Sequence, residues 1–196
     1  MASSATPYGL RPTNILGSSP MSHGLRQYAI TAAYGTSIFQ GDLVKLVVGG
    51  TIEKDTGTST ANPVGVFWGV EYEDAAMGLL HKNMWTASTS VKSGTTAWAY
   101  VYDAPDMLFE VQSNSTCTQN IIGTNVPLVQ GTGNSATGIS GVVIAGASLN
   151  STATLPIRVV DYVNRPGFSQ LGDAKTDLIV RINTHFNSTA LANAGS

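Results

Sequence analysis

Histidine and cysteine are the side chains best suited to metal binding and nucleophilic catalysis, and this sequence of 196 residues holds three histidines and one cysteine. His23, His81 and His185 lie far apart, and none belongs to a pattern such as HExxH, which places two zinc ligands on one helix face. Cys117 could form a nucleophilic pair with His81, but a lone cysteine between strand-like segments is far more often an inert apolar side chain. The single cysteine also excludes an internal disulfide and a CxxC metal or redox pair.

Two further segments hold only part of a known motif. The loop GTGNSATGISG, residues 131–141, has glycines at the spacing of a phosphate-binding loop, but Ile139 stands where the essential lysine would be. Glu71, Glu73 and Asp74 could hold a hard cation such as calcium, but the DxDxDG pattern of a calcium loop is absent. The sequence therefore predicts a protein that is not an enzyme, with no catalytic residue, no metal site and no cofactor.

Aromatic residues gather in the middle of the chain, where they could form a platform on which sugars stack. Trp98, Tyr100 and Tyr102 alternate with small apolar residues in TAWAYVYD, so both faces of the expected strand are apolar. Such a strand is typical of a core or a subunit interface, and we expect these three residues to form an oligomer interface. Trp85, in the loop-like segment KNMWTAS, would be the sugar contact of a carbohydrate-binding module.

Short apolar segments separated by glycine turns recur along the chain and predict an all-β fold. Gly49 and Gly50 are expected to turn the strand DLVKLVV back into the strand TIEKD. About ten such strands, without a long helix, predict a sandwich or barrel over residues 27–186. Residues 187–196 are expected to be a frayed tail.

Two of the expected strands have a marked period of 2. Residues 64–70 carry an apolar residue at every second position, which predicts one buried face. In the last strand, Leu178, Val180 and Ile182 should point inward, with Arg181 and Asn183 outward.

Residues 1–26 differ from the rest of the chain. Three prolines and three glycines interrupt them, and their apolar residues are too sparse for strand or helix periodicity. Proline lowers the entropy that an extended segment loses when it is ordered on another surface. We therefore expect an extended N-terminal arm outside the core, able to lie along a partner.

The composition favours association with other proteins. Charged residues make up 11% of the chain, against about 25% in a typical soluble domain, and the net charge is −2. A surface of serine, threonine, asparagine and glycine costs little to desolvate. The charge balance excludes a nucleic-acid-binding footprint, and no apolar stretch is long enough to cross a membrane.

The order of several segments resembles small structural proteins of tailed phages. These segments are TPYGLRPTNILG, YGTSIFQGDLVKL with GTIEKD, PVGVFWGVEYED, TLPIRVVDYV and TDLIVRINTHF. In that family a G-D-x-V-x-L strand, a G-x-[IV] hairpin and a V-G-V-F strand recur, and the likeness runs over residues 7–186. Such proteins are usually encoded beside the major capsid protein and are described as decoration, or cement, proteins.

The resemblance implies a protein of the virion, assembled in the host cytoplasm and bound to the outer surface of an icosahedral capsid. Its partner would be the major capsid protein, it would form a homo-oligomer, expected to be a trimer, and it would bind neither nucleic acid nor a membrane. The expected capsid contacts of the arm are Tyr8, Leu10, Arg11, Pro12, Ile15 and Leu16. The alternative function is a carbohydrate- or receptor-binding β module of a virion, such as a fibre head.

Overall fold

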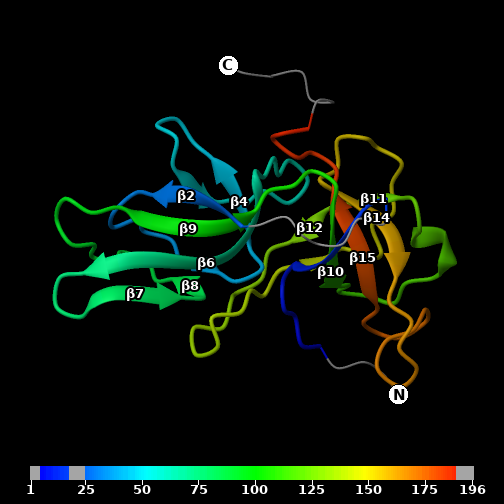
Figure 1. The fold of residues 1–196 in the computed structure, drawn as a ribbon. Helices are drawn as coiled ribbons and strands as arrows, with labels where there is room; N and C mark the ends of the chain where they lie inside the picture. The colour runs from blue at the N-terminus through cyan, green and yellow to red at the C-terminus, as the bar shows by residue number, and fades with distance from the viewer. Residues whose placement is uncertain (1–4, 18–24, 189–196) are drawn as a thin grey trace.

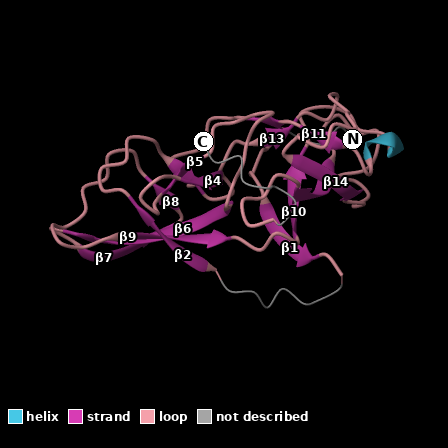
Figure 2. Ribbon diagram, turned by 90° about the horizontal axis from the view of Figure 1, so that it is seen from above, coloured by secondary structure: helices cyan, strands magenta, loops and turns pink. Residues whose placement is uncertain are grey.

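A computed structural model of the chain describes residues 5–17 and 25–188. These residues form short, mostly antiparallel strands, and the only helical element among them is a 3-10 turn at Gln119–Ile121. The all-β fold expected from the sequence is therefore confirmed. Figure 1 shows two large sheets that lie side by side, and Figure 2 shows the same arrangement from above.

The first large sheet has five strands in the order β1-β10-β15-β14-β11. These are β1 (Arg11–Ile15), β10 (Met107–Gln112), β15 (Asp177–Ile182), β14 (Ile157–Tyr162) and β11 (Asn125–Val126). The second has six strands, in the order β2-β9-β6-β4-β5, with β7 paired to the far end of β6. These are β2 (Arg26–Ile30), β9 (Ala97–Tyr102), β6 (Gly65–Asp74), β4 (Leu43–Leu46), β5 (Ile52–Lys54) and β7 (Gly78–Lys82).

Each large sheet buries one face against a two-stranded sheet. The five-stranded sheet shares a core with β12 (Leu128–Val129) and β13 (Val143–Ile144). The six-stranded sheet shares a second core with β3 (Ile38–Phe39) and β8 (Met84–Trp85). The molecule thus has two sandwich-like lobes, each with its own core, which we call the five-stranded lobe and the six-stranded lobe.

Two local predictions agree with the structure. Strands β4 and β5 form a hairpin whose turn holds Gly49 and Gly50, both with positive φ, at +104° and +77°. In β15, Leu178, Val180 and Ile182 are buried in the core of the five-stranded lobe.

Strand β6 departs from the expected period of 2 because it contains a β-bulge. Its register against β9 shifts at Trp68, and an extra residue in one strand changes which face the following side chains occupy. Phe67 and Val70 face the core of the six-stranded lobe, whereas Val66 enters the core of the five-stranded lobe. The single buried face expected for this segment is therefore wrong, because the strand contributes to both cores.

The N-terminal segment belongs to the five-stranded lobe, which corrects the expectation of an arm outside the core. Strand β1 pairs antiparallel with β10 at the edge of the sheet. Leu10 is fully buried in the core of this lobe, and Ile15 is also buried. No period is visible in the sequence because the register shifts between Pro12 and Asn14, which interrupts the alternation. Residues 1–4 and 18–24 of the expected arm, and 189–196 of the expected tail, lie outside the described residues.

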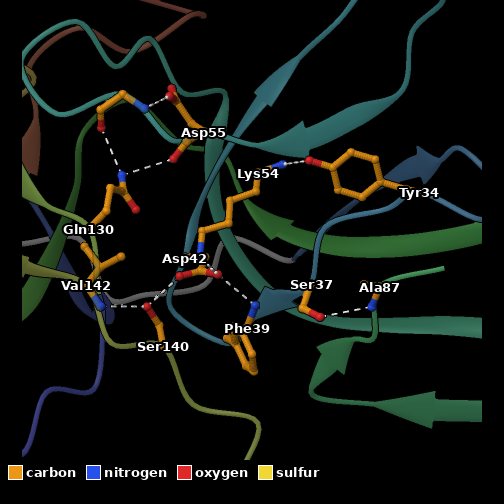
Figure 3. A network of polar contacts seen from close by, with 11 residues as sticks. Tyr34, Ser37, Phe39, Asp42, Lys54, Asp55, Ala87, Gln130, Ser140 and Val142 are labelled. Carbon is orange, nitrogen blue, oxygen red and sulfur yellow. Dashed lines mark hydrogen bonds and ion pairs between the residues drawn. The ribbon is translucent and has the colours of Figure 1, made fainter. Parts of the chain in front are cut away.

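A buried polar network joins the two lobes beside this segment (Figure 3). The carboxylate of Asp42, which is fully buried, forms an ion pair with Lys54 Nζ at 2.8 Å. It also accepts hydrogen bonds from Ser140 Oγ at 2.6 Å and from the Phe39 N–H at 2.8 Å. Ser140 Oγ in turn accepts from the Val142 N–H at 3.1 Å. Because a buried charge is costly unless it is paired, these bonds hold β3 with the following turn, β5 and the loop at 140–142 in one arrangement.

Gly9 makes the closest approach between the N-terminal segment and this network. Its φ is +69°, and a Cβ there would lie 2.6 Å from the carbonyl oxygen of Gly41 and 2.6 Å from Cβ of Ser140. Gly41, the glycine of the G-D pair in FQGDL, therefore packs directly against Gly9 and holds the N-terminal segment in place. The residues on both sides of Gly9 are fixed in position as a result.

Candidate functional site

An open groove of about 510 Å³ lies on the outer face of the five-stranded sheet, beside the N-terminal segment. Its main lining residues are Tyr8, Arg11, Glu110, Arg165, Phe168 and Asp177. We call it the Tyr8 groove. A second open cavity, of about 310 Å³, lies on the other side of Thr6 and Pro7, against the loop at 132–141. The first residues of the described chain therefore run between two concave surfaces.

The pairing of β10 with β15 gathers the polar residues of the groove. Gln112 lies opposite Asp177, and Glu110 lies two residues before Gln112 on the same face of β10. Phe109 and Val111 alternate with them and face the core. The two acidic side chains are thus neighbours on the outer face of the sheet.

Glu110 is only 4% exposed, and its carboxylate is held from two directions. The Arg165 guanidinium binds it with two parallel bonds, Nη1 to Oε1 at 3.0 Å and Nη2 to Oε2 at 3.1 Å. The Tyr8 hydroxyl lies 3.2 Å from Glu110 Oε1 and 3.0 Å from Asp177 Oδ1, so it bridges the two carboxyl groups. Bidentate contacts of this kind are strong and restrict geometry.

Burial also affects which groups of the Tyr8 groove carry a proton. Burial raises the pKa of Tyr8 above its ordinary value, and the charges of Asp177 and Glu110 raise it further. Burial also raises the pKa of Asp177, although the hydrogen bond from Tyr8 opposes the shift. The phenol therefore stays protonated and acts as a donor. The floor of the groove is a fixed set of hydrogen bonds.

The rim of the Tyr8 groove offers groups that a partner could contact. The guanidinium of Arg11 lies over the Tyr8 ring, 4.6 Å from its centre. The Arg165 side chain is 55% exposed, and Phe168 is 79% exposed. Cationic and aromatic groups around a neutralised floor suit a peptide segment that carries acidic and apolar side chains.

The six residues expected to contact a capsid lie in different environments. Arg11 and Leu16 are exposed, Pro12 is half-buried, and Tyr8 lines the groove. Leu10 and Ile15 are buried within the chain's own fold, so they are not available to a partner. The expectation is corrected for these two residues, because their apolar side chains complete a core instead of entering a neighbour.

The three residues expected at an oligomer interface are also separated. Trp98 is 41% exposed on the open face of the six-stranded sheet, while Tyr100 and Tyr102 are half-buried. Tyr102 meets the Trp68 ring edge-on, with ring centres 5.4 Å apart, and packs against the core of the five-stranded lobe. The interface itself stays a prediction, and Tyr102 has a role within the chain.

Trp85 does not lie in an exposed loop, so it is not a sugar contact. It is fully buried in β8, and its indole N–H donates to the Tyr34 carbonyl oxygen at 3.1 Å. Nor does the structure bring Cys117 and His81 together as a nucleophilic pair. Cys117 lies in the core of the five-stranded lobe, and His81 lies on β7 of the other lobe.

Within residues 5–17 and 25–188, no group of three or more histidine, cysteine, aspartate or glutamate side chains is placed to hold a metal ion. The same residues include no apolar helix of membrane-spanning length.

Sequence reasoning missed Glu110, Asp177 and Arg165. They come from three segments that only the sheet and the loop after β14 bring together. Glu110 did leave a signal, since it is the one acidic residue within the apolar run MLFEV. A charge in such a run is rarely buried unless a partner neutralises it.

Comparison with protein-family models, with curated proteins and with solved structures finds no match for this chain.

Proposed function

We infer that the chain is a structural protein of a phage virion that decorates the outer surface of an icosahedral capsid and cements it. The observation that carries this proposal is the Tyr8 groove, a concave surface with a rigid floor and an exposed rim of Arg11, Arg165 and Phe168. The ordered series of phage-like segments supports the class of protein, and the low charge supports a surface that spends its time against a partner.

The proposed partner is the major capsid protein, and the groove would hold an extended segment of it. An extended segment binds well in a preformed groove because the groove loses little conformational freedom on binding. Aromatic and arginine side chains are the residues most often responsible for interface affinity. Phe168, Arg11 and Arg165 would therefore supply most of the binding, in place of the buried Leu10 and Ile15.

Stabilisation of the shell would follow from several such contacts acting together. If the chain is a homotrimer, each subunit can bind a different capsid subunit, and linked contacts raise the avidity by roughly 10²–10⁴ without new chemistry. A ligand that binds only the intact shell stabilises it by mass action. The mechanism is binding, with no catalytic step, at the virion surface.

The test is binding to shells assembled from the proposed partner, a phage major capsid protein. Purified wild-type protein should add to such shells at a fixed copy number, measured by quantitative mass spectrometry. The double variant Arg11→Ala with Phe168→Ala should need at least about tenfold more protein for half occupancy, because two exposed interface anchors are lost. Val48→Ala is the matched control, since Val48 is a fully exposed apolar residue on the β4–β5 turn of the other lobe.

Equal occupancy by the double variant and the wild type, at limiting protein concentration, would exclude the groove as the contact. The oligomeric state is measured separately by sedimentation. A single species of 20.4 kDa at micromolar concentration would contradict the trimer.

A further inference from the structure

The outer face of the six-stranded sheet is open around Trp98, whereas its end at Val66 and Tyr102 packs against the five-stranded lobe. Along β9, Ala97, Ala99 and Val101 point into the core and Trp98 points away from it. In the register of the sheet, Trp98 lies between Ala29 on β2 and Glu71 on β6. The small side chain of Ala29 leaves the indole accessible from that side.

Polar groups beside this indole are already connected by hydrogen bonds. Tyr100 donates its hydroxyl proton to Glu71 Oε2 at 2.7 Å and accepts a bond from Gln27 Nε2 at 3.2 Å. On the other side of Glu71, His81 Nδ1 lies 3.4 Å from the same carboxylate oxygen. The His81 side chain is 64% exposed. Donors and acceptors are thus fixed in place on the same face as the indole.

The charge of this face argues against two classes of partner. Its acidic groups each have a basic neighbour, Glu71 with His81 and Glu73 with Lys92, so it lacks the positive excess that a nucleic acid requires. A second protein subunit would bury Glu71 and the Glu73–Lys92 ion pair, whereas interface centres are depleted of charge. The large apolar side chains that the described residues expose on this face are only Trp98 and Leu79.

A neutral ligand rich in hydroxyl groups is complementary to such a face. The apolar C–H surface of a pyranose ring can stack on an exposed indole, as other flat apolar groups do. Its hydroxyls can donate to a carboxylate and accept from an imidazole or amide N–H. Trp98 and Tyr100 are two residues apart along β9, a separation of roughly 7 Å, so the face is longer than one sugar ring.

We propose that this face, centred on Trp98 and flanked by Tyr100, Glu71, His81 and Gln27, binds a neutral oligosaccharide or polysaccharide. The site is on the other lobe from the Tyr8 groove and does not depend on capsid binding. A chain held on a shell by one lobe would present this face on the other.

The test uses the intact chain and a panel of neutral probes, namely maltohexaose, cellohexaose, chitohexaose and mannohexaose. At least one should change tryptophan emission at millimolar concentration and protect the indole from acrylamide. The signal reports Trp98, because Trp85 is buried and Trp68 is half-buried. Calorimetry with the active probe should show that Trp98→Ala weakens binding by about tenfold.

Two further variants test whether a loss of affinity is confined to changes on this face. Glu71→Gln removes the charged acceptor and should also lower the affinity, while Val48→Ala, on the β4–β5 turn, should bind as the wild type does. Circular dichroism checks that Trp98→Ala is folded, which we expect because the side chain lies outside the core.

Three outcomes would overturn the proposal. The first is that no probe of the panel binds by calorimetry, and the second is that Trp98→Ala binds as well as the wild type. The third is that Trp98 of the wild type is protected from acrylamide without sugar, increasingly as the protein concentration rises, and that Trp98→Ala sediments as a smaller species than the wild type. A second copy of the chain would then occupy the face. None of these outcomes bears on occupancy of the capsid through the Tyr8 groove, so the two proposals fail separately.

Discussion

Gly9 is the residue at which the start of the chain meets the junction of the two lobes. It needs a left-handed backbone, with φ at +69°, and it also needs the absence of a side chain, because Gly41 and Ser140 lie within 2.6 Å of where a Cβ would be. Gly17 has a similar φ of +98° but nothing within 4 Å. A side chain added at Gly17 therefore incurs only the cost of the backbone conformation, whereas one added at Gly9 also incurs the cost of the steric contact.

We expect Gly9→Ala to lower the free energy of unfolding by about 2–4 kcal/mol, since strain and a steric clash add. Gly17→Ala should cost only about 1 kcal/mol, from the backbone alone. Equilibrium urea unfolding measures both. Equal losses in the two variants would show that the Gly9 contact is not present in solution.

His185 is a buried histidine that makes stability depend on pH. Its Nδ1 accepts a hydrogen bond from the Asn187 N–H at 3.1 Å, so the proton of the neutral ring is on Nε2. Burial lowers the pKa of His185 below its ordinary value, and the charge of Asp103 only partly opposes this. Below about pH 6.5 the unfolded chain binds a proton at this site more readily than the folded chain does.

The free energy of unfolding should therefore fall as the pH is lowered from 7.5 to 5.5. The folded pKa is depressed, so the contribution is present above the unfolded pKa and is lost as the pH falls through the folded one. In His185→Gln this decline should be reduced, as measured by urea unfolding at both pH values. His81→Gln, which removes a largely exposed imidazole, is the control for loss of a histidine. A decline of the same size in wild type and His185→Gln would assign it to other groups.

Strand β1 is the element whose role changes most between sequence and structure. It is an edge strand, held by pairing with β10 on one side and by the burial of Leu10 and Ile15. Removal of a fully buried side chain costs both its transfer free energy and the cavity that remains. The segment therefore contributes to the stability of the fold, whatever it also contributes to binding.

Leu10→Ala should destabilise the protein by about 2–5 kcal/mol, measured as a fall in the urea midpoint. Leu16→Ala removes the same atoms from a side chain that is 44% exposed, and it should cost less than about 1 kcal/mol. If Leu10→Ala unfolds at the wild-type midpoint, the N-terminal segment is not docked as described, and an arm free of the core becomes the better account.

At the scale of the whole molecule, the two lobes are joined by shared strands. Strand β4 places Leu43 in the core of the five-stranded lobe and Val44 in the core of the six-stranded lobe. Strand β6 does the same with Val66 and Phe67. Because neither core can lose these strands without the other being disturbed, we expect the lobes to unfold together.

Two probes in different lobes can test this cooperativity. All three tryptophans lie on strands of the six-stranded lobe, and Cys117 lies in the core of the five-stranded lobe. Tryptophan emission and pulsed thiol labelling of Cys117 should therefore give the same urea midpoint. Labelling of Cys117 at a lower urea concentration than the change in emission would show that the five-stranded lobe opens first.

The sequence by itself determined the class of fold and several local turns. Alternation of apolar and polar residues is a property of neighbours in the chain, so the inward face of β15 and the glycine turn of the β4–β5 hairpin could be predicted from it. A surface with few charges could also be predicted, because the number of charged residues is a property of the composition and does not depend on the fold.

Only the tertiary structure decided which apolar residues face which core and which polar residues meet. The bulges in β1 and β6 change the face of each following side chain, and a bulge depends on the partner strand. Glu110, Arg165 and Asp177 meet because β10 and β15 pair and the loop after β14 returns over them, although they are far apart in sequence. The exposure of Trp98 likewise depends on which face of its sheet is covered, which is a property of packing and has no signature in the order of residues along one strand.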